Sequence, residues 1–348
     1  MKRALCLLLP AAVAAPLVAA PAEAAPEFWK TFRKTDRALL ERVESFGKGN
    51  TWFYGYAVNA GASPVLWQWN GKKLVKTKVP GAFKGGVADV DFSSRTNGWA
   101  VGYNITQSGA TKVSVLRWNG KAWRIVREAA TEALFPQVKI LGGGAVVVTG
   151  ITRGEETLLE WRFDGRAWTE VETGTWLTGF SGNYALGSFD NGQDLARWTG
   201  KAWKRVKVGA RPGGFSVLDR LEVRSAKEIW LTAETLKADG SGTTHVLRWD
   251  GKRWTRAKVP VPAKGAVLDI AADGSGGLWV TVDPAGRSVS GVGKKTLLLH
   301  RLPSGKWGKT STKVLARGIA RVPGTRSLWA IGTLLPRTEG IFTRGGAR

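Results

Sequence analysis

A two-part motif that recurs along the chain constrains its fold more than any other feature. The first part is a short apolar stretch led by an aromatic or apolar residue, and it recurs at Trp52, Trp99, Val147, Tyr184, Trp230, Trp279 and Trp329. These positions are 47, 48, 37, 46, 49 and 50 residues apart. Periods in the forties built from short strands are typical of propeller blades. The spacing predicts an all-β fold, a seven-bladed β-propeller of four-stranded antiparallel blades.

The second part of the motif reads Trp-Asn/Asp-Gly-Lys-x-Trp. Copies lie at residues 69–72, 118–123, 163–168, 198–203 and 249–254, with a degenerate copy at 303–307. An Asn-Gly or Asp-Gly pair between two strands is a strong hairpin signal. We expect it to join the third and fourth strands of each blade through a type I′ turn, with positive φ at both central residues.

The repeats divide the chain into blades. The expected blades span residues 37–80, 86–128, 135–173, 175–208, 215–259, 266–314 and 315–348 of one propeller domain, 25–348. The last blade lacks a fourth strand, whereas residues 27–33 resemble the fourth strand around Trp203. We therefore expect the N-terminal segment to complete the last blade, closing the ring and covering an open sheet edge.

The first 24 residues have the pattern of a cleaved signal peptide. Lys2 and Arg3 precede an apolar stretch that ends in Ala-x-Ala steps, and such a segment directs secretion. Cys6, the single cysteine, lies inside it. The mature chain is expected to be extracellular, without a membrane span, and held together by its core without disulfides.

Tryptophan is abundant, but most copies are accounted for by the repeat. Of the 18 tryptophans, all but Trp67, Trp161 and Trp176 fall on repeat positions. A large apolar side chain at the same place in each blade is expected to pack between neighbouring sheets. A lectin-like propeller that stacks sugars on its repeat tryptophans would instead need them exposed.

The chain carries a formal net charge of +25, which draws polyanions in general. The cations concentrate in the hairpin between the third and fourth strands and in the fourth strand. They are expected either to protect sheet edges or to form a ring that binds a polymer through many weak contacts. That ring comprises Lys72, Lys121, Arg166, Lys201, Lys252 and Lys306. The long loop before the sixth blade's third strand adds Arg287, Lys294 and Lys295 as binding candidates.

The innermost strands are expected to line a central channel with charged side chains of both signs, namely Arg42, Asp89, Asp91, Lys139, Asp219, Arg220, Glu222, Asp269 and Arg317. Asp89, Asp91 and Asp269 are the candidates for acid–base chemistry, although such residues more often pair with neighbouring cations. His245 and His300 lie on predicted third strands without the neighbours that a zinc site or a catalytic triad needs. We expect no metal and no cofactor.

The pattern resembles secreted actinobacterial proteins in which Trp-Ala-Val-Gly strands alternate with Trp-Asp-Gly-x-x-Trp hairpins, often described as galactose-oxidase-like or kelch-like propellers. The resemblance covers residues 27–348 and implies a propeller without a conserved reaction. Galactose oxidase chemistry is not expected, because its copper site resembles two Tyr and two His with a Tyr-Cys crosslink, and the mature chain has no cysteine.

These observations lead to one functional hypothesis and two alternatives. We expect a secreted, monomeric, non-enzymatic propeller that binds an anionic cell-surface polymer or a protein, and nucleic acid only non-specifically. The first alternative is a polysaccharide lyase or hydrolase with a channel site. The second is a lectin-like propeller.

Overall fold

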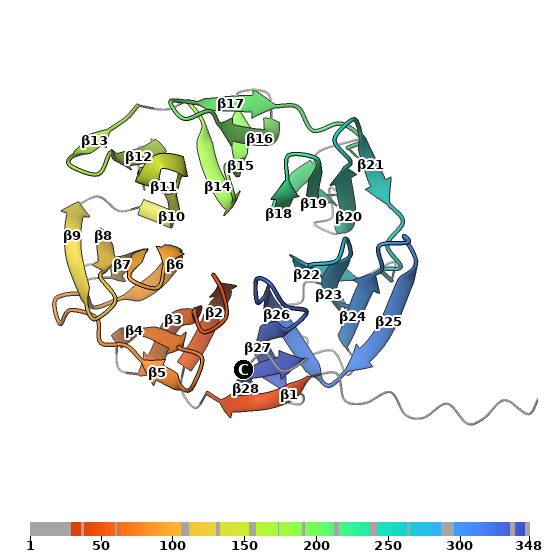
Figure 1. The fold of residues 1–348 in the computed structure, drawn as a ribbon, viewed down its shortest axis with the longest axis horizontal. Coiled ribbons are helices and arrows are strands. Elements are labelled where there is room, and N and C mark those ends of the chain that lie inside the picture. The colour runs from red at the N-terminus through yellow and green to blue at the C-terminus, as the bar shows by residue number, and fades with distance from the viewer. Residues whose placement is uncertain are drawn as a thin grey trace, which may run out of the picture.

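Seven four-stranded antiparallel sheets form a closed ring around a central channel (Figure 1). The computed structural model describes residues 29–35, 38–59, 61–105, 111–129, 133–152, 158–172, 174–189, 192–211, 216–236, 242–262, 265–286, 296–334 and 338–344. The predicted seven-bladed β-propeller is confirmed. The described part of the chain contains no helix long and apolar enough to cross a bilayer.

In each of the first six blades the strands follow the chain outward from the channel. Blade 1 has β2 (Ala38–Ser45), β3 (Thr51–Asn59), β4 (Gly61–Trp69) and β5 (Leu74–Lys76). Blade 2 has β6 (Gly86–Ser94), β7 (Asn97–Ile105), β8 (Thr111–Trp118) and β9 (Trp123–Ala129). Blade 3 has β10 (Ala133–Ile140), β11 (Val146–Thr152), β12 (Leu158–Phe163) and β13 (Trp168–Glu170), with a short 3-10 turn, η1 (Gly142–Gly144).

The remaining blades repeat this order until the last. Blade 4 has β14 (Trp176–Ser181), β15 (Tyr184–Phe189), β16 (Gly192–Trp198) and β17 (Trp203–Val206). Blade 5 has β18 (Ser216–Ser225), β19 (Glu228–Leu236), β20 (Gly242–Trp249) and β21 (Trp254–Ala257). Blade 6 has β22 (Ala266–Ala272), β23 (Leu278–Asp283), β24 (Thr296–Arg301) and β25 (Trp307–Thr312). Blade 7 has β26 (Val314–Arg321), β27 (Leu328–Leu334), β28 (Thr338–Arg344) and the N-terminal strand β1 (Lys30–Lys34).

Strand β1 closes the ring, as expected from its resemblance to a fourth strand. It pairs antiparallel with β28, from Lys30 opposite Thr343 to Lys34 opposite Gly340. The ring of Phe32 meets Trp69 of blade 1 and Trp329 of blade 7 edge-on, at centroid distances of 5.5 and 5.1 Å. The first described segment therefore supplies both hydrogen bonds and an apolar contact across the seam between the first and last blades.

The core consists of apolar clusters between neighbouring blades. The five second-strand tryptophans, at 52, 99, 230, 279 and 329, are at most 5% exposed, so the expectation that repeat tryptophans pack between sheets is confirmed for them. Trp67 and Trp161, which fall outside the repeat, are buried as well. The cluster between blades 3 and 4 is smaller, with Leu141, Val147 and Trp198 as its buried members, because Val147 stands where other blades carry tryptophan.

The hairpins between third and fourth strands differ from the expected turn. Trp69 pairs with Leu74, so the connection has four residues, and φ is positive at Gly71 but not at Asn70. Equivalent glycines at 120, 165, 200 and 251 behave alike. The type I′ prediction is wrong. The Asn70 side chain instead accepts the backbone N–H groups of Lys72 and Lys73, which closes the turn without a second positive φ.

Candidate functional site

The innermost strands of all seven blades enclose a central cavity of about 1020 Å³. The nine charged residues that the sequence predicted for the channel all line it: Arg42, Asp89, Asp91, Lys139, Asp219, Arg220, Glu222, Asp269 and Arg317. The structure thus brings the three acid–base candidates to one cavity. Their hydrogen bonds indicate what each does there.

Asp89, Asp91 and Asp269 each join one blade to the next. Asp89 Oδ2 accepts the N–H of Val138 at 3.0 Å, and Asp91 Oδ2 accepts that of Ile140 at 2.7 Å. Asp269 Oδ2 accepts the N–H of Ile319 at 2.8 Å. Asp91 also contacts the Lys139 ammonium at 2.8 Å. These carboxylates satisfy buried backbone donors of the neighbouring innermost strand, which is a structural task.

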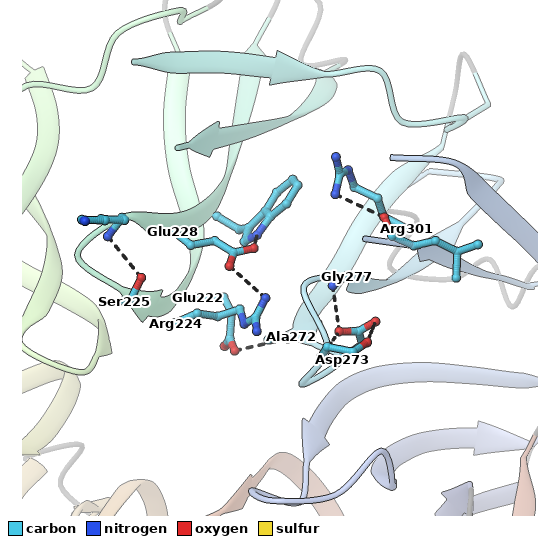
Figure 2. Close-up of polar contacts among 12 residues, drawn as sticks. Glu222, Arg224, Ser225, Glu228, Ala272, Asp273, Gly277 and Arg301 are labelled. Atoms are coloured by element: carbon cyan, nitrogen blue, oxygen red, sulfur yellow. Dashed lines mark hydrogen bonds and ion pairs between the residues drawn. The ribbon is translucent and has the colours of Figure 1, made fainter. Parts of the chain in front are cut away.

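The same contact recurs around the ring with other side chains. Glu222 Oε1 accepts the N–H of Ala272 at 3.2 Å, between blades 5 and 6 (Figure 2). In the same view, Asp273 holds its own turn together through the N–H of Gly277. Ser181 accepts from Val223, and Gln137 accepts from Gly179. Since serine and glutamine serve as well as aspartate, the contact needs an acceptor and not a charge.

Glu44 and Asp89 share one hydroxyl group. Tyr54 Oη lies 2.7 Å from Glu44 Oε1 and 3.1 Å from Asp89 Oδ1, and one hydroxyl proton can satisfy only one of them. Burial, reinforced by the charge of Asp89, raises the pKa of Glu44 to about 8. Burial also raises the pKa of Asp89. A protonated Glu44 that donates to Tyr54 Oη leaves the tyrosine proton for Asp89, so the geometry and the raised pKa agree.

The six candidate ring cations lie far from the cavity. Lys72, Lys121, Arg166, Lys201, Lys252 and Lys306 each occupy a hairpin leading into an outermost strand, one per blade (Figure 1). All six are exposed. Among the described residues, none of their side chains makes a hydrogen bond or an ion pair. We call these six residues the perimeter cations.

Other cations of the repeat are engaged internally. The Arg117 guanidinium lies 5.3 Å from the ring centroid of Trp99, and Arg248 lies at the same distance from Trp230. Both pairs are direct neighbours across the second and third strands, so the motif arginine covers the motif tryptophan. This contrast separates structural cations from those available to an external anion.

Arg287, Lys294 and Lys295 lie outside the described residues. His245 and His300 lie on the third strands β20 and β24, as expected, and His300 stacks on Trp279 while contacting Asp273 at 2.9 Å. Within the described ranges, no three His, Cys, Asp or Glu side chains are grouped so that they could hold a metal ion.

Four cavity residues were not singled out as candidates from the sequence. Glu41 and Glu44 flank the predicted Arg42, and Phe135 and Trp176 lie at the starts of β10 and β14. Strand alternation places Glu44 on the same face as Arg42, so that signal was present. Trp176 was visible only as a tryptophan outside the repeat, and Phe135 carries no sequence signal.

No protein-family model matches the sequence, and no curated protein matches it. Solved structures of similar fold include YCF48 bound to a D1 peptide, with 14% identity, a TM-score of 0.59, and coverage of 91% of this chain and 96% of that one. A PL25 polysaccharide lyase, an ulvan lyase bound to -[GlcA(1-4)Rha3S]-, has 10% identity, a TM-score of 0.58 and coverage of 90% and 94%. The propeller domain of the trilobed protease from Pyrococcus furiosus has 10% identity, a TM-score of 0.55 and coverage of 89% and 96%. At these identities the similarity shows the shared fold alone.

Proposed function

We propose that this chain is a secreted, non-enzymatic binding protein whose perimeter cations engage an anionic cell-surface polymer. The observation that carries the proposal is the set of six exposed cations, one per blade, whose side chains have no internal partner among the described residues. A polymer that follows the perimeter would meet them in succession, and several weak contacts on one rigid ring add up. The signal peptide expected at residues 1–24 would place the protein where such polymers occur.

The two alternatives have less support. For a channel enzyme, Asp89, Asp91 and Asp269 would need to be available for proton transfer, yet each accepts a backbone N–H of the next blade. For a lectin-like propeller, the repeat tryptophans would need exposure, yet those on the second strands are buried. A protein partner stays compatible with the fold, because a propeller of similar fold is bound to a peptide.

The proposal is tested by retention of the purified protein on immobilised teichoic acid, heparin and a neutral glucan. One variant converts all six perimeter cations to Gln. The matched control converts six exposed lysines elsewhere to Gln: Lys78, Lys84, Lys112, Lys207, Lys258 and Lys313. The perimeter variant should elute from the anionic columns at lower salt than the control, with the slope of log affinity against log salt reduced by about 3 to 5.

The two variants lose the same number of charges, so general attraction to polyanions weakens equally in both. Equal elution of the perimeter variant and the control would show that the positive charge acts diffusely. That result would reject the perimeter as a binding surface.

A further inference from the structure

Phe135, at the start of β10, is more exposed than any other large apolar residue in the described part of the chain. Its side chain is 64% exposed, and its φ of +52° lies in the left-handed region. A bulky side chain at positive φ costs about 1–2 kcal/mol, and such strain concentrates at binding and catalytic positions. The pairing of β10 with β11 shifts between Leu134 and Gln137, which turns this residue out of the regular ladder.

Phe135 is not alone at this end of the cavity. Trp176, on the neighbouring blade 4, lies 6.2 Å away between ring centroids with its plane tilted by 38°. Tyr103 and Leu134 line the same cavity. We call these four residues the channel mouth. They lie where the innermost strands begin or where the paired second strand ends, at the opposite end of the blades from the hairpins that carry the perimeter cations.

Below the channel mouth the cavity is acidic, although the whole chain is strongly basic. Seven carboxyl side chains and four cationic ones line it. Three of the cations are engaged: Lys139 contacts Asp91, Arg220 contacts Asp219, and Arg317 makes two contacts with Glu339. Only Arg42 then faces Glu41, Glu44 and Asp89. The cavity walls therefore hold more negative than positive charge.

We propose that the channel mouth and the acidic wall below it bind a peptide segment that carries a lysine or arginine next to apolar residues. Phe135 and Trp176 would hold the apolar part and attract the cation through their ring faces. Glu41, Glu44 and Asp89 would then meet the ammonium or guanidinium group. The net positive charge of the chain does not prevent this, because at physiological salt charges more than about 8 Å away are largely screened. This site is separate from the perimeter cations and does not depend on their role.

Isothermal titration calorimetry with three blocked pentapeptides tests the proposal. The probes are acetyl-Leu-Lys-Leu-Lys-Leu-amide and its counterparts with Glu or Gln in place of Lys. The Lys peptide should bind about tenfold or more tighter than the Glu peptide, with the Gln peptide between them. A Lys peptide that binds no tighter than the Glu peptide at pH 7.5 overturns the proposal.

Two variants locate the site without threatening the fold. Phe135→Gly removes the ring and relieves the positive φ, so it should weaken the Lys peptide about fivefold while the melting temperature stays equal or rises. Glu41→Gln, at an exposed residue, should weaken the Lys peptide but not the Gln peptide. The matched control is Leu302→Ser, since Leu302 is also exposed, at 41%, but does not line the cavity. Unchanged affinity in Phe135→Gly, or equal loss in Leu302→Ser, would rule out the channel mouth as the site.

Discussion

Asp89, Asp91 and Asp269 face the cavity, but each also accepts a backbone N–H from the next innermost strand. Their place in the channel was predictable from strand alternation. Their partners were not, because those partners lie 49 or 50 residues away and come within reach only through the curvature of the ring. A carboxylate at a channel position is therefore weak evidence for catalysis until its acceptor atoms are accounted for.

Replacing Asp269 with Asn separates the structural role from a catalytic one. Asp269 accepts the N–H groups of Ile270 and Ile319 and lies 3.6 Å from the Arg220 guanidinium. The amide group of Asn can accept only one of these N–H groups and turns its own donors toward the other. Asp269→Asn should lower the free energy of unfolding by about 1–3 kcal/mol, measured by urea denaturation. Unchanged stability would contradict the inter-blade role and return Asp269 to the list of catalytic candidates.

Glu44 gives a pH dependence whose sign follows from its raised pKa. Its pKa is about 8 in the folded protein against 4.5 ordinarily, so between these pH values the folded state holds a proton that the unfolded state releases. The stability from this group is full below about 4.5 and is lost as the pH rises to about 8. Arg42 of β2, Tyr54 of β3, Asp89 and Asp91 of β6 and Lys139 of β10 are the groups that act on it.

Glu44→Gln mimics the protonated side chain, because its amide can donate to Tyr54 Oη. The variant should melt close to the wild type at pH 4.5 and above it at pH 8.5, with the gap widening as the pH rises. Melting curves of both proteins across this range measure the difference. A constant gap would mean that Glu44 stays ionised in the folded protein.

At the scale of the strand, the chain closes its ring with β1. This closure could be expected from the likeness of residues 27–33 to other fourth strands, since each blade needs four strands and the last one had three. The side-chain contacts of Phe32 with Trp69 and Trp329 were not evident, because they join the two ends of the sequence. The hairpin geometry was predicted wrongly, since the Asn70 side chain closes a four-residue turn.

Truncation of Phe32 tests the contribution of β1 to stability. Phe32→Ala removes the ring that packs across the seam, and we expect a loss of about 3 kcal/mol in the free energy of unfolding. Thr31→Ala, an exposed residue of the same strand, is the control and should melt like the wild type. If both variants melt alike, the hydrogen bonds to β28 and not the apolar contact hold β1 in place.

At the scale of the whole molecule, charge is divided between two regions. The perimeter cations surround the outside of the ring, and the carboxyl groups concentrate in the cavity. Composition reports only the sum, +25, which suggests attraction of polyanions everywhere. The folded ring instead presents a basic perimeter and an acidic centre, so an anionic polymer is favoured on the outside and disfavoured in the channel.

The sequence alone determined the number of blades, the strand order within each blade and the burial of the second-strand tryptophans, because a repeat states the same local pattern several times and each copy needs its neighbours to bury its apolar face. The tertiary structure alone decided which polar groups are engaged and which stay available. Closing the ring brings together residues some fifty positions apart, so the hydrogen bonds of Asp89, the hydroxyl shared by Glu44 and Asp89, and the exposed pair of Phe135 and Trp176 depend on how adjacent blades meet. No local pattern encodes that meeting, since each partner lies in a different repeat.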